Sequence, residues 1–122
     1  MVLRRFAVQM SVCKVPDLSQ VDLEDTFCFL GKTDEELSVV CRTERAPANA
    51  TQRDDGWRIL RIEGQLDFSL IGILAEIADI LAQNEIGIFA VSTYNTDYIL
   101  TKQQHYQKAL CCLREAGHQI EG

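Results

Sequence analysis

Two stretches of sequence decide the fold expected for this chain: DFSLIGIL (residues 67–74) and VSTYNTD (residues 91–97). The first is typical of a junction between a strand and a helix, and the second of a polar hairpin tip. In a split βαβ fold these two places lie side by side at one edge of the sheet. They would form a small polar pocket without an evident catalytic residue. The pattern therefore favours binding of a small molecule over its chemical transformation.

The second half of the chain has the more regular pattern and predicts the element order β-α-β-β-α-β. Ser69 suits the N-cap of the first helix, Gly117 ends the second, and TKQQ (residues 101–104) has the form of a capping box. This order predicts an antiparallel sheet with both helices on one face, the ferredoxin-like arrangement. The predicted strands are 57–63, 88–93, 96–101 and 118–121, and the predicted helices are 69–84 and 102–116.

The first half offers strands but no clear helix, so it resembles a degenerate version of the same plan. A Pro-containing loop stands where the first helix would be, and a polar stretch at 43–55 ends in the turn signal Asp54-Asp55-Gly56. The predicted class is α+β, with a degenerate N-terminal unit at 1–53 and a complete unit at 54–122. The predicted strands of the first half are 5–13, 26–30 and 36–42.

Composition excludes several classes of partner. The 122 residues are 47% apolar and 25% charged, an ordinary globular profile, with a net charge of -6. Such an acidic chain lacks the basic face that nucleic acid or an anionic membrane surface requires. No apolar run has the length of a bilayer span, and the first residues lack the apolar core of a signal peptide. We therefore expect a cytoplasmic protein with no nucleic-acid or membrane partner.

The cysteines and histidines do not form a recognisable site. None of the five cysteines belongs to a Cys-x-x-Cys pair, and His105 and His118 have no ligand spacing relative to them. Reduced, mostly buried thiols are expected, with no metal and no cofactor. A small enzyme using Cys111 or Cys112 is the weakest alternative, because neither has an evident base nearby.

The candidate site combines groups for both signs of charge. The helix N-terminus at Ser69 offers unpaired N–H groups to a carboxylate. Gly72 either lets a ligand approach or relieves crowding between helix and strand; Asp67 either caps the helix or faces an ammonium group. Asp97 either accepts a positive group or ties down the hairpin. A free α-amino acid matches this pattern. The candidate ligand-binding residues are Asp67, Phe68, Ser69, Gly72, Ser92, Thr93, Asn95 and Asp97.

The runs GQLDFSLIGIL (residues 64–74) and IFAVSTYNTDYIL (residues 88–100) resemble the ACT domain family. More narrowly, they are similar to small paired-ACT proteins related to the aspartokinase regulatory region and to the cytosolic arginine sensors of animals. The resemblance implies a regulatory, usually dimeric fold that holds an amino acid between ACT units. It also implies that Asp97 meets the cationic end of the ligand. The first half departs from the family where the Pro-containing loop replaces a helix.

Two functions remain as hypotheses. The leading one is a non-catalytic, homodimeric regulatory module that binds an amino acid and passes the effect to a partner. The alternative is a dimerisation or protein-interaction module with no ligand. In that case the apolar helix at 69–84 and the exposed sheet edges serve assembly alone.

Overall fold

The computed structural model of the chain describes residues 1–63 and 72–122. The contacts between described residues divide the chain into two compact units. We call residues 8–57 the N-terminal unit, and residues 1–7 together with 58–122 the C-terminal unit. The division into 1–53 and 54–122 stays a prediction, whereas the contacts group the first seven residues with the C-terminal unit.

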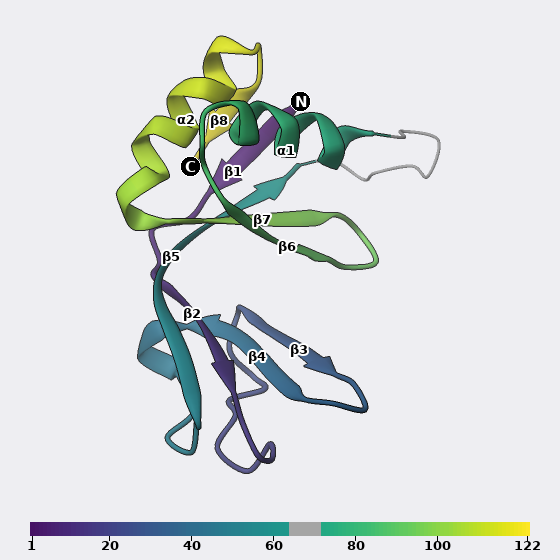
Figure 1. Cartoon of the computed structure of the whole chain (residues 1–122), viewed down its shortest axis with the longest axis vertical. Helices are drawn as coiled ribbons and strands as arrows, with labels where there is room; N and C mark the ends of the chain where they lie inside the picture. Colours follow the sequence, from purple (N-terminus) through teal and green to yellow (C-terminus); the bar gives the residue numbers. More distant parts are fainter. Residues whose placement is uncertain (64–71) are drawn as a thin grey trace. The chain divides into compact units, whose positions relative to one another are not determined.

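The C-terminal unit has the predicted order β-α-β-β-α-β and an α+β, ferredoxin-like fold. Both α-helices lie over one face of its sheet (Figure 1). Neither of these helices, taken over the described residues, is long and apolar enough to cross a membrane. Its elements are β1 (Val2–Arg5), β5 (Gln52–Ile62), α1 (Ile73–Gln83), β6 (Ile88–Ser92), β7 (Asp97–Lys102), η2 (Gln103–His105), α2 (Tyr106–Glu115) and β8 (Gln119–Glu121).

The sheet of this unit contains one strand that the pattern of the second half alone does not supply. β7 pairs with β5 on one side and with β6 on the other. β1 pairs antiparallel with β5, with Leu3 opposite Ile62, and β8 pairs parallel with β1, with Leu3 opposite Ile120. The first strand of the chain therefore lies between β5 and β8.

The core of the C-terminal unit forms between this sheet and the two helices. Leu60 and Ile62 of β5 are almost fully buried there, as are Ile77 and Leu81 of α1. Burial of a side chain of this size stabilises a fold by about 1.5–3 kcal/mol. The other buried members of the cluster are Leu3, Ile86, Ile99, Tyr106, Ala109, Leu110 and Leu113.

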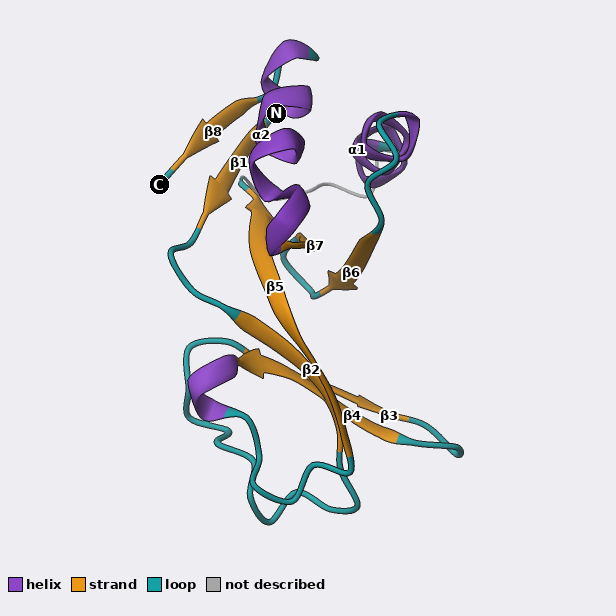
Figure 2. Ribbon diagram, turned by 60° about the vertical axis from the view of Figure 1, so that its left-hand side comes forward, coloured by secondary structure: helices purple, strands orange, loops and turns teal. Residues whose placement is uncertain are grey.

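The N-terminal unit has a strand plan similar to that of the C-terminal unit but lacks its α-helices. Its strands have the order β3-β4-β2-β5, in which the first and last strands of the unit are neighbours. The structure describes all of residues 8–57, and they contain no α-helix; the short purple coil of this unit in Figure 2 is the 3-10 helix at residues 43–45. Besides the first half of β5, the elements are β2 (Met10–Lys14), β3 (Cys28–Lys32), β4 (Leu37–Arg42) and η1 (Thr43–Arg45).

The loop that stands in place of the first helix is tied to β4 by an ion pair. Arg42 donates from Nε to Asp25 Oδ2 at 2.8 Å and from Nη2 to Oδ1 at 2.6 Å. The Asp25 side chain is only 7% exposed. Two parallel charge-assisted hydrogen bonds of this kind fix geometry as well as adding energy. They supply part of the anchoring that a packed helix provides in the other unit.

The hairpins of the two units match at a constant spacing of 60 residues, from Thr33 to Thr93. Thr33 N donates to Glu36 O at 2.9 Å, and Thr93 N donates to Thr96 O at 2.9 Å. The strand registers agree as well: residue 32 lies opposite 37, and residue 92 opposite 97. The two units therefore share one hairpin plan although their turn sequences differ, TDEE against TYNT.

The predicted strand at 5–13 is wrong, because β1 ends at Arg5 and β2 begins at Met10. The two strands belong to different units, and the chain passes from one to the other between them. Alternation of apolar and polar residues continues through this passage, so it could not reveal the break. The same alternation would place Ser11 on the face opposite the apolar residues Met10 and Val12, but Ser11 is fully buried.

The predicted turn at Asp54-Asp55-Gly56 is also wrong, because these residues lie inside β5. Gly56 has φ +86°, and the pairing of β5 with β2 shifts register beside it. One extra residue on one strand makes a β-bulge, and glycine is the residue that adopts such a φ without strain. The turn signal therefore marks a bulge in a continuous strand.

Three local predictions at turns and helix ends need correction. α1 begins at Ile73 with Gly72 as its N-cap, so Ser69 is not the cap. The capping box before α2 does not form, since η2 precedes the helix and neither N-cap residue makes a side-chain cap hydrogen bond. Asparagine tolerates positive φ, which suits Asn95 to a tight hairpin, but among the described non-glycine residues only Glu85 has a positive φ.

Candidate functional site

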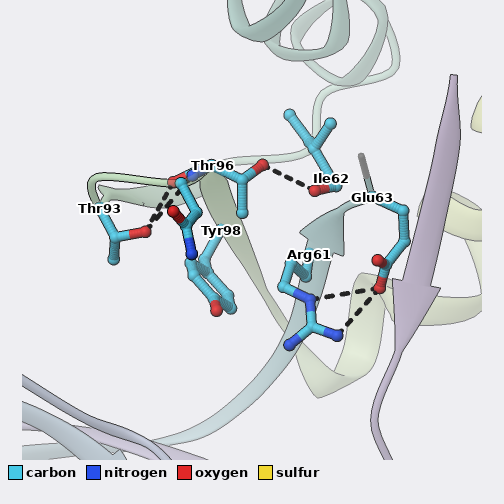
Figure 3. Close-up of a pocket in the computed structure, with 7 residues that line it drawn as sticks. Arg61, Ile62, Glu63, Thr93, Thr96 and Tyr98 are labelled. Atoms are coloured by element: carbon cyan, nitrogen blue, oxygen red, sulfur yellow. Dashed lines mark hydrogen bonds and ion pairs between the residues drawn. The ribbon is translucent and has the colours of Figure 1, made fainter. Parts of the chain in front are cut away.

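A hollow of about 470 Å³ lies in the C-terminal unit between the end of β5 and the β6–β7 hairpin. Figure 3 shows Arg61 and Glu63 on one side of it and Thr93 and Tyr98 on the other. Its volume is within the range of small-molecule sites. The described residues that line it are Arg61, Ile62, Glu63, Thr93, Asn95, Thr96 and Tyr98.

Hydrogen bonds hold the hairpin tip against β5. Thr96 Oγ1 donates to the carbonyl oxygen of Ile62 at 2.6 Å, and the Thr96 residue is 7% exposed. Thr93 Oγ1 donates to the carbonyl oxygen of Thr96 at 3.0 Å. The polar tip is therefore fixed beside the end of the strand that leads into residues 64–71. These hydroxyl groups are already used as donors within the protein.

The charged wall of the hollow is a shared ion pair. Arg61 donates to Glu63 Oε1 from Nε at 3.2 Å and from Nη2 at 3.0 Å. Arg4 Nε donates to the same oxygen at 3.0 Å. The guanidinium carbon of Arg61 also lies 4.9 Å from the centre of the Phe6 ring, within reach of a cation–π contact. The Arg61 side chain is thus held on several sides at the rim of the hollow.

The environment keeps Arg61 protonated. Partial burial by itself would lower its pKa, but hydrogen bonds to Tyr98 and Glu63 outweigh that effect and raise the pKa of Arg61 above its ordinary value. The site therefore presents a permanent cation beside one carboxylate.

The alternation of strand β5 explains why these groups meet. Leu60 and Ile62 belong to the core under the helices, so Arg61 and Glu63 point to the opposite face of the sheet. Ile99 of β7 also belongs to that core, which turns its neighbour Tyr98 toward the same side as Arg61. The hollow therefore opens on the sheet face that the helices do not cover.

The predicted site residues separate into three groups. Thr93 and Asn95 line the hollow. Ser92 and Asp97 do not; Ser92 Oγ donates to Asp97 Oδ1 at 2.5 Å, which is the hairpin-tying role. Asp97 also lies one residue from Tyr98 and so points to the other face.

The remaining predicted residues belong to the strand-to-helix junction. Gly72 has φ +91°, and a side chain there would meet nothing within 4 Å. The glycine is therefore explained by its backbone conformation rather than by crowding between helix and strand. Asp67, Phe68 and Ser69 lie outside the described residues, so their part in a site stays a prediction.

Sequence reasoning did not identify Arg61, Glu63 and Tyr98 as site residues. A signal was present, since Arg61 and Glu63 are two residues apart in a strand and must share a face. What the sequence lacked was the register that brings Tyr98 of β7 beside them. Residues 61 and 98 are far apart in the sequence, so the sequence alone does not predict that they are neighbours in the sheet.

The groups around the hollow suit binding. The lining residues that the structure describes supply one guanidinium, one carboxylate, one amide and hydroxyl groups, and none of them is a histidine or a cysteine. Elsewhere, burial is the main cause that raises the pKa of the Cys41 thiol to about 12, so it stays protonated and unreactive. The arrangement matches a small polar molecule that carries charges of both signs.

In the comparison with known protein families, the family model described as ACT domain matches residues 52–115. The matched region contains α1, α2 and all the described residues that line the hollow. Comparison with functionally curated proteins finds no match.

Solved structures of the same fold cover nearly the whole chain. A crystallised protein of Agrobacterium tumefaciens is 28% identical, with a TM-score of 0.87, over 98% of this chain and 90% of that one. A protein of unknown function from Vibrio cholerae, described as a possible transport protein, is 22% identical with a TM-score of 0.69, over 93% and 88%. The ligand-free regulatory subunit of aspartate kinase from Thermus thermophilus is 10% identical with a TM-score of 0.59, over 94% and 96%. The last two likenesses show the fold alone.

Proposed function

Because this chain belongs to the ACT domain family, we propose that it is a regulatory module that binds a free α-amino acid and does not transform it. Family membership makes it a regulatory, ligand-binding type of module in general. The amino acid as ligand is the part that we propose.

One observation carries this proposal: the described residues that line the hollow include charged groups of both signs together with hydrogen-bonding groups. Arg61 offers N–H donors to a carboxylate. Asn95 offers an amide oxygen to an ammonium group, and the carboxylate of Glu63 adds negative charge to the same wall. The absence of a histidine or cysteine among the described lining residues fits binding without catalysis.

The proposed site also includes the strand-to-helix junction. Ile62, which accepts the hydrogen bond from Thr96, is followed after one residue by the segment that leads to Asp67, Phe68 and Ser69. The family resemblance implies ligand contacts in that segment. We therefore keep these three residues as proposed contacts together with Asn95.

Isothermal titration of the full chain with each of the twenty amino acids tests the proposal. We expect one or a few of them to bind and the rest to give no heat. Asn95→Ala should weaken binding about tenfold, because it removes a hydrogen-bonding group at the rim. Glu35→Ala is the matched control, since Glu35 has the same turn position in the hairpin of the other unit. No binding of any amino acid by folded protein would refute the proposal.

A homodimeric state is a second proposal, and strand β6 favours it. β6 is at an edge of its sheet, pairing with β7, and its sequence IFAVS carries no charge and no proline. Proteins usually place charged residues or proline on an edge strand, which prevents it from pairing with another chain. By contrast, the edge strands β3 and β8 each carry a charged residue. A second copy pairing along β6 would protect this edge.

Sedimentation velocity over a range of protein concentrations tests the dimer. We expect the wild-type chain to sediment as a dimer and Ala90→Lys, in the exposed middle of β6, as a monomer. Ala82→Lys, at an exposed position of α1, is the control for added charge. A wild-type monomer at all concentrations would count against the dimer, and dimerisation without any amino-acid binding would favour the interaction module with no ligand.

A further inference from the structure

We infer that Arg61 is the anchor for the ligand's carboxylate and that Glu63 positions Arg61 instead of receiving the ligand's ammonium group. The inference rests on the proposed amino-acid-binding function and deepens it. It predicts that the class of ligand is defined by a free carboxylate, so that amino-acid amides and decarboxylated amines do not bind.

The anchor follows from the groups that can still donate a hydrogen bond into the hollow. Arg61 is the only cation among the described residues that line it. The hydroxyl groups of Thr93 and Thr96 already donate to backbone carbonyl oxygens. A carboxylate entering the hollow therefore has one strong partner, the guanidinium of Arg61, with the amide of Asn95 at the rim.

The guanidinium is held in place for this role. Its Nε and Nη2 atoms donate to Glu63 and its carbon lies over the Phe6 ring. In Figure 3 one guanidinium nitrogen points away from Glu63, toward the side of Tyr98, to which Arg61 also hydrogen-bonds. Because a guanidinium has five N–H donors, these contacts leave donors for a carboxylate. A planar donor group that is already fixed loses little conformational entropy when a carboxylate binds.

The surroundings of Glu63 argue against its binding an ammonium group. One of its carboxylate oxygens accepts hydrogen bonds from two guanidinium groups, those of Arg4 and Arg61. A third cation would meet one negative charge and two positive ones at short range. Glu121 reaches Arg4 Nη2 at 3.4 Å but does not line the hollow, and its side chain is 50% exposed. The carboxylate of Glu63 is thus committed to holding the arginines.

The first experiment compares ligands on wild-type protein. The amino acid that binds most tightly in the titration series is tested beside its amide and its decarboxylated amine. We expect both analogues to lose at least tenfold in affinity, because each lacks the charge-assisted contact with Arg61. Equal binding of the amide would overturn the inference while leaving amino-acid binding in place. No binding of any compound would instead refute the proposed function.

The second experiment separates the roles of the two charged residues. Arg61→Gln should weaken carboxylate binding by about 10- to 100-fold. Arg53→Gln is the matched control, because Arg53 also pairs with an acid two residues along β5, Asp55, but does not line this hollow. Loss of affinity in both variants alike would count against a specific anchor.

Glu63→Gln tests the role of the carboxylate, and we do not expect it to weaken binding as Arg61→Gln does. It keeps an oxygen acceptor for the arginines and removes the negative charge that competes with the ligand's carboxylate. We expect affinity to rise, or to fall by less than threefold. A fall of tenfold or more, with the far-ultraviolet circular dichroism unchanged, would mean that Glu63 receives the ammonium group and would overturn the assignment. If a variant does not fold, the comparison of ligands on wild-type protein still decides the question.

Discussion

The hydrogen bond from Thr96 to Ile62 is the contact that fixes the hairpin tip beside the hollow, and its removal gives a quantitative test of the structure. Thr96→Val keeps the shape of the side chain and deletes the hydroxyl that donates at 2.6 Å. Because the Thr96 residue is only 7% exposed, water cannot easily replace the lost donor. The Ile62 carbonyl oxygen is then left without its side-chain partner.

The expected cost follows from that burial. Leaving a buried acceptor unsatisfied costs about 1–3 kcal/mol of unfolding free energy. For a chain of this size this corresponds to a fall in Tm of roughly 4–12 °C. The measurement is urea and thermal unfolding followed by far-ultraviolet circular dichroism.

Thr51→Val is the matched control for this prediction. Thr51 Oγ1 also donates to a backbone carbonyl oxygen, that of Lys14 at 3.2 Å, but at an exposed position. Water can replace that bond, so the control should cost less than about 0.5 kcal/mol. The reasoning is refuted if Thr96→Val costs no more than Thr51→Val. Thr96→Ser, which keeps the hydroxyl, should recover part of the loss.

Two further predictions concern the loop of the N-terminal unit and the start of α1. Hydrogen bonds from Arg42 are the main cause that lowers the pKa of Asp25 in the folded protein. The ion pair therefore stabilises the fold fully at a pH above the ordinary Asp pKa of about 3.9. This stabilisation is lost as the pH falls through the lowered pKa of the folded state. Asp25→Asn should therefore reduce stability more at pH 6 than at pH 2.5, as read by urea unfolding, and an equal loss at both pH values would contradict the ion pair. Gly72→Ala places a side chain at φ +91° and should cost about 1–2 kcal/mol in thermal unfolding. Gly87→Ala, where no positive φ is found and nothing lies within 4 Å, should be close to neutral, and equal effects at the two glycines would contradict the backbone argument.

Local patterns in the sequence were sufficient for the order of the elements in the second half of the chain. The order β-α-β-β-α-β, the hairpin centred on residues 93–96 and the helix end at Gly117 all depend on neighbours a few residues apart. Hydrophobic period and turn chemistry report such relations directly. The same patterns placed Thr93 and Asn95 at a polar tip, and both residues line the hollow.

Other features depend on which distant strands pair, and local patterns do not contain that information. Alternation cannot show that β1 ends at Arg5 and that β2, a strand of the other unit, begins at Met10. Nor can a turn signal show that Gly56 forms a bulge, because the bulge exists only relative to β2.

The sequence by itself determined the family of fold, the acidic balance of charge and the polar hairpin. Tertiary structure alone decided the composition of the hollow, because strand register joins Arg61 of β5 and Glu63, which follows this strand, to Tyr98 of β7 across 35 residues of chain, from 63 to 98. The physical reason is that side chains two residues apart share a face through backbone geometry, whereas side chains on different strands meet only once the whole sheet has formed.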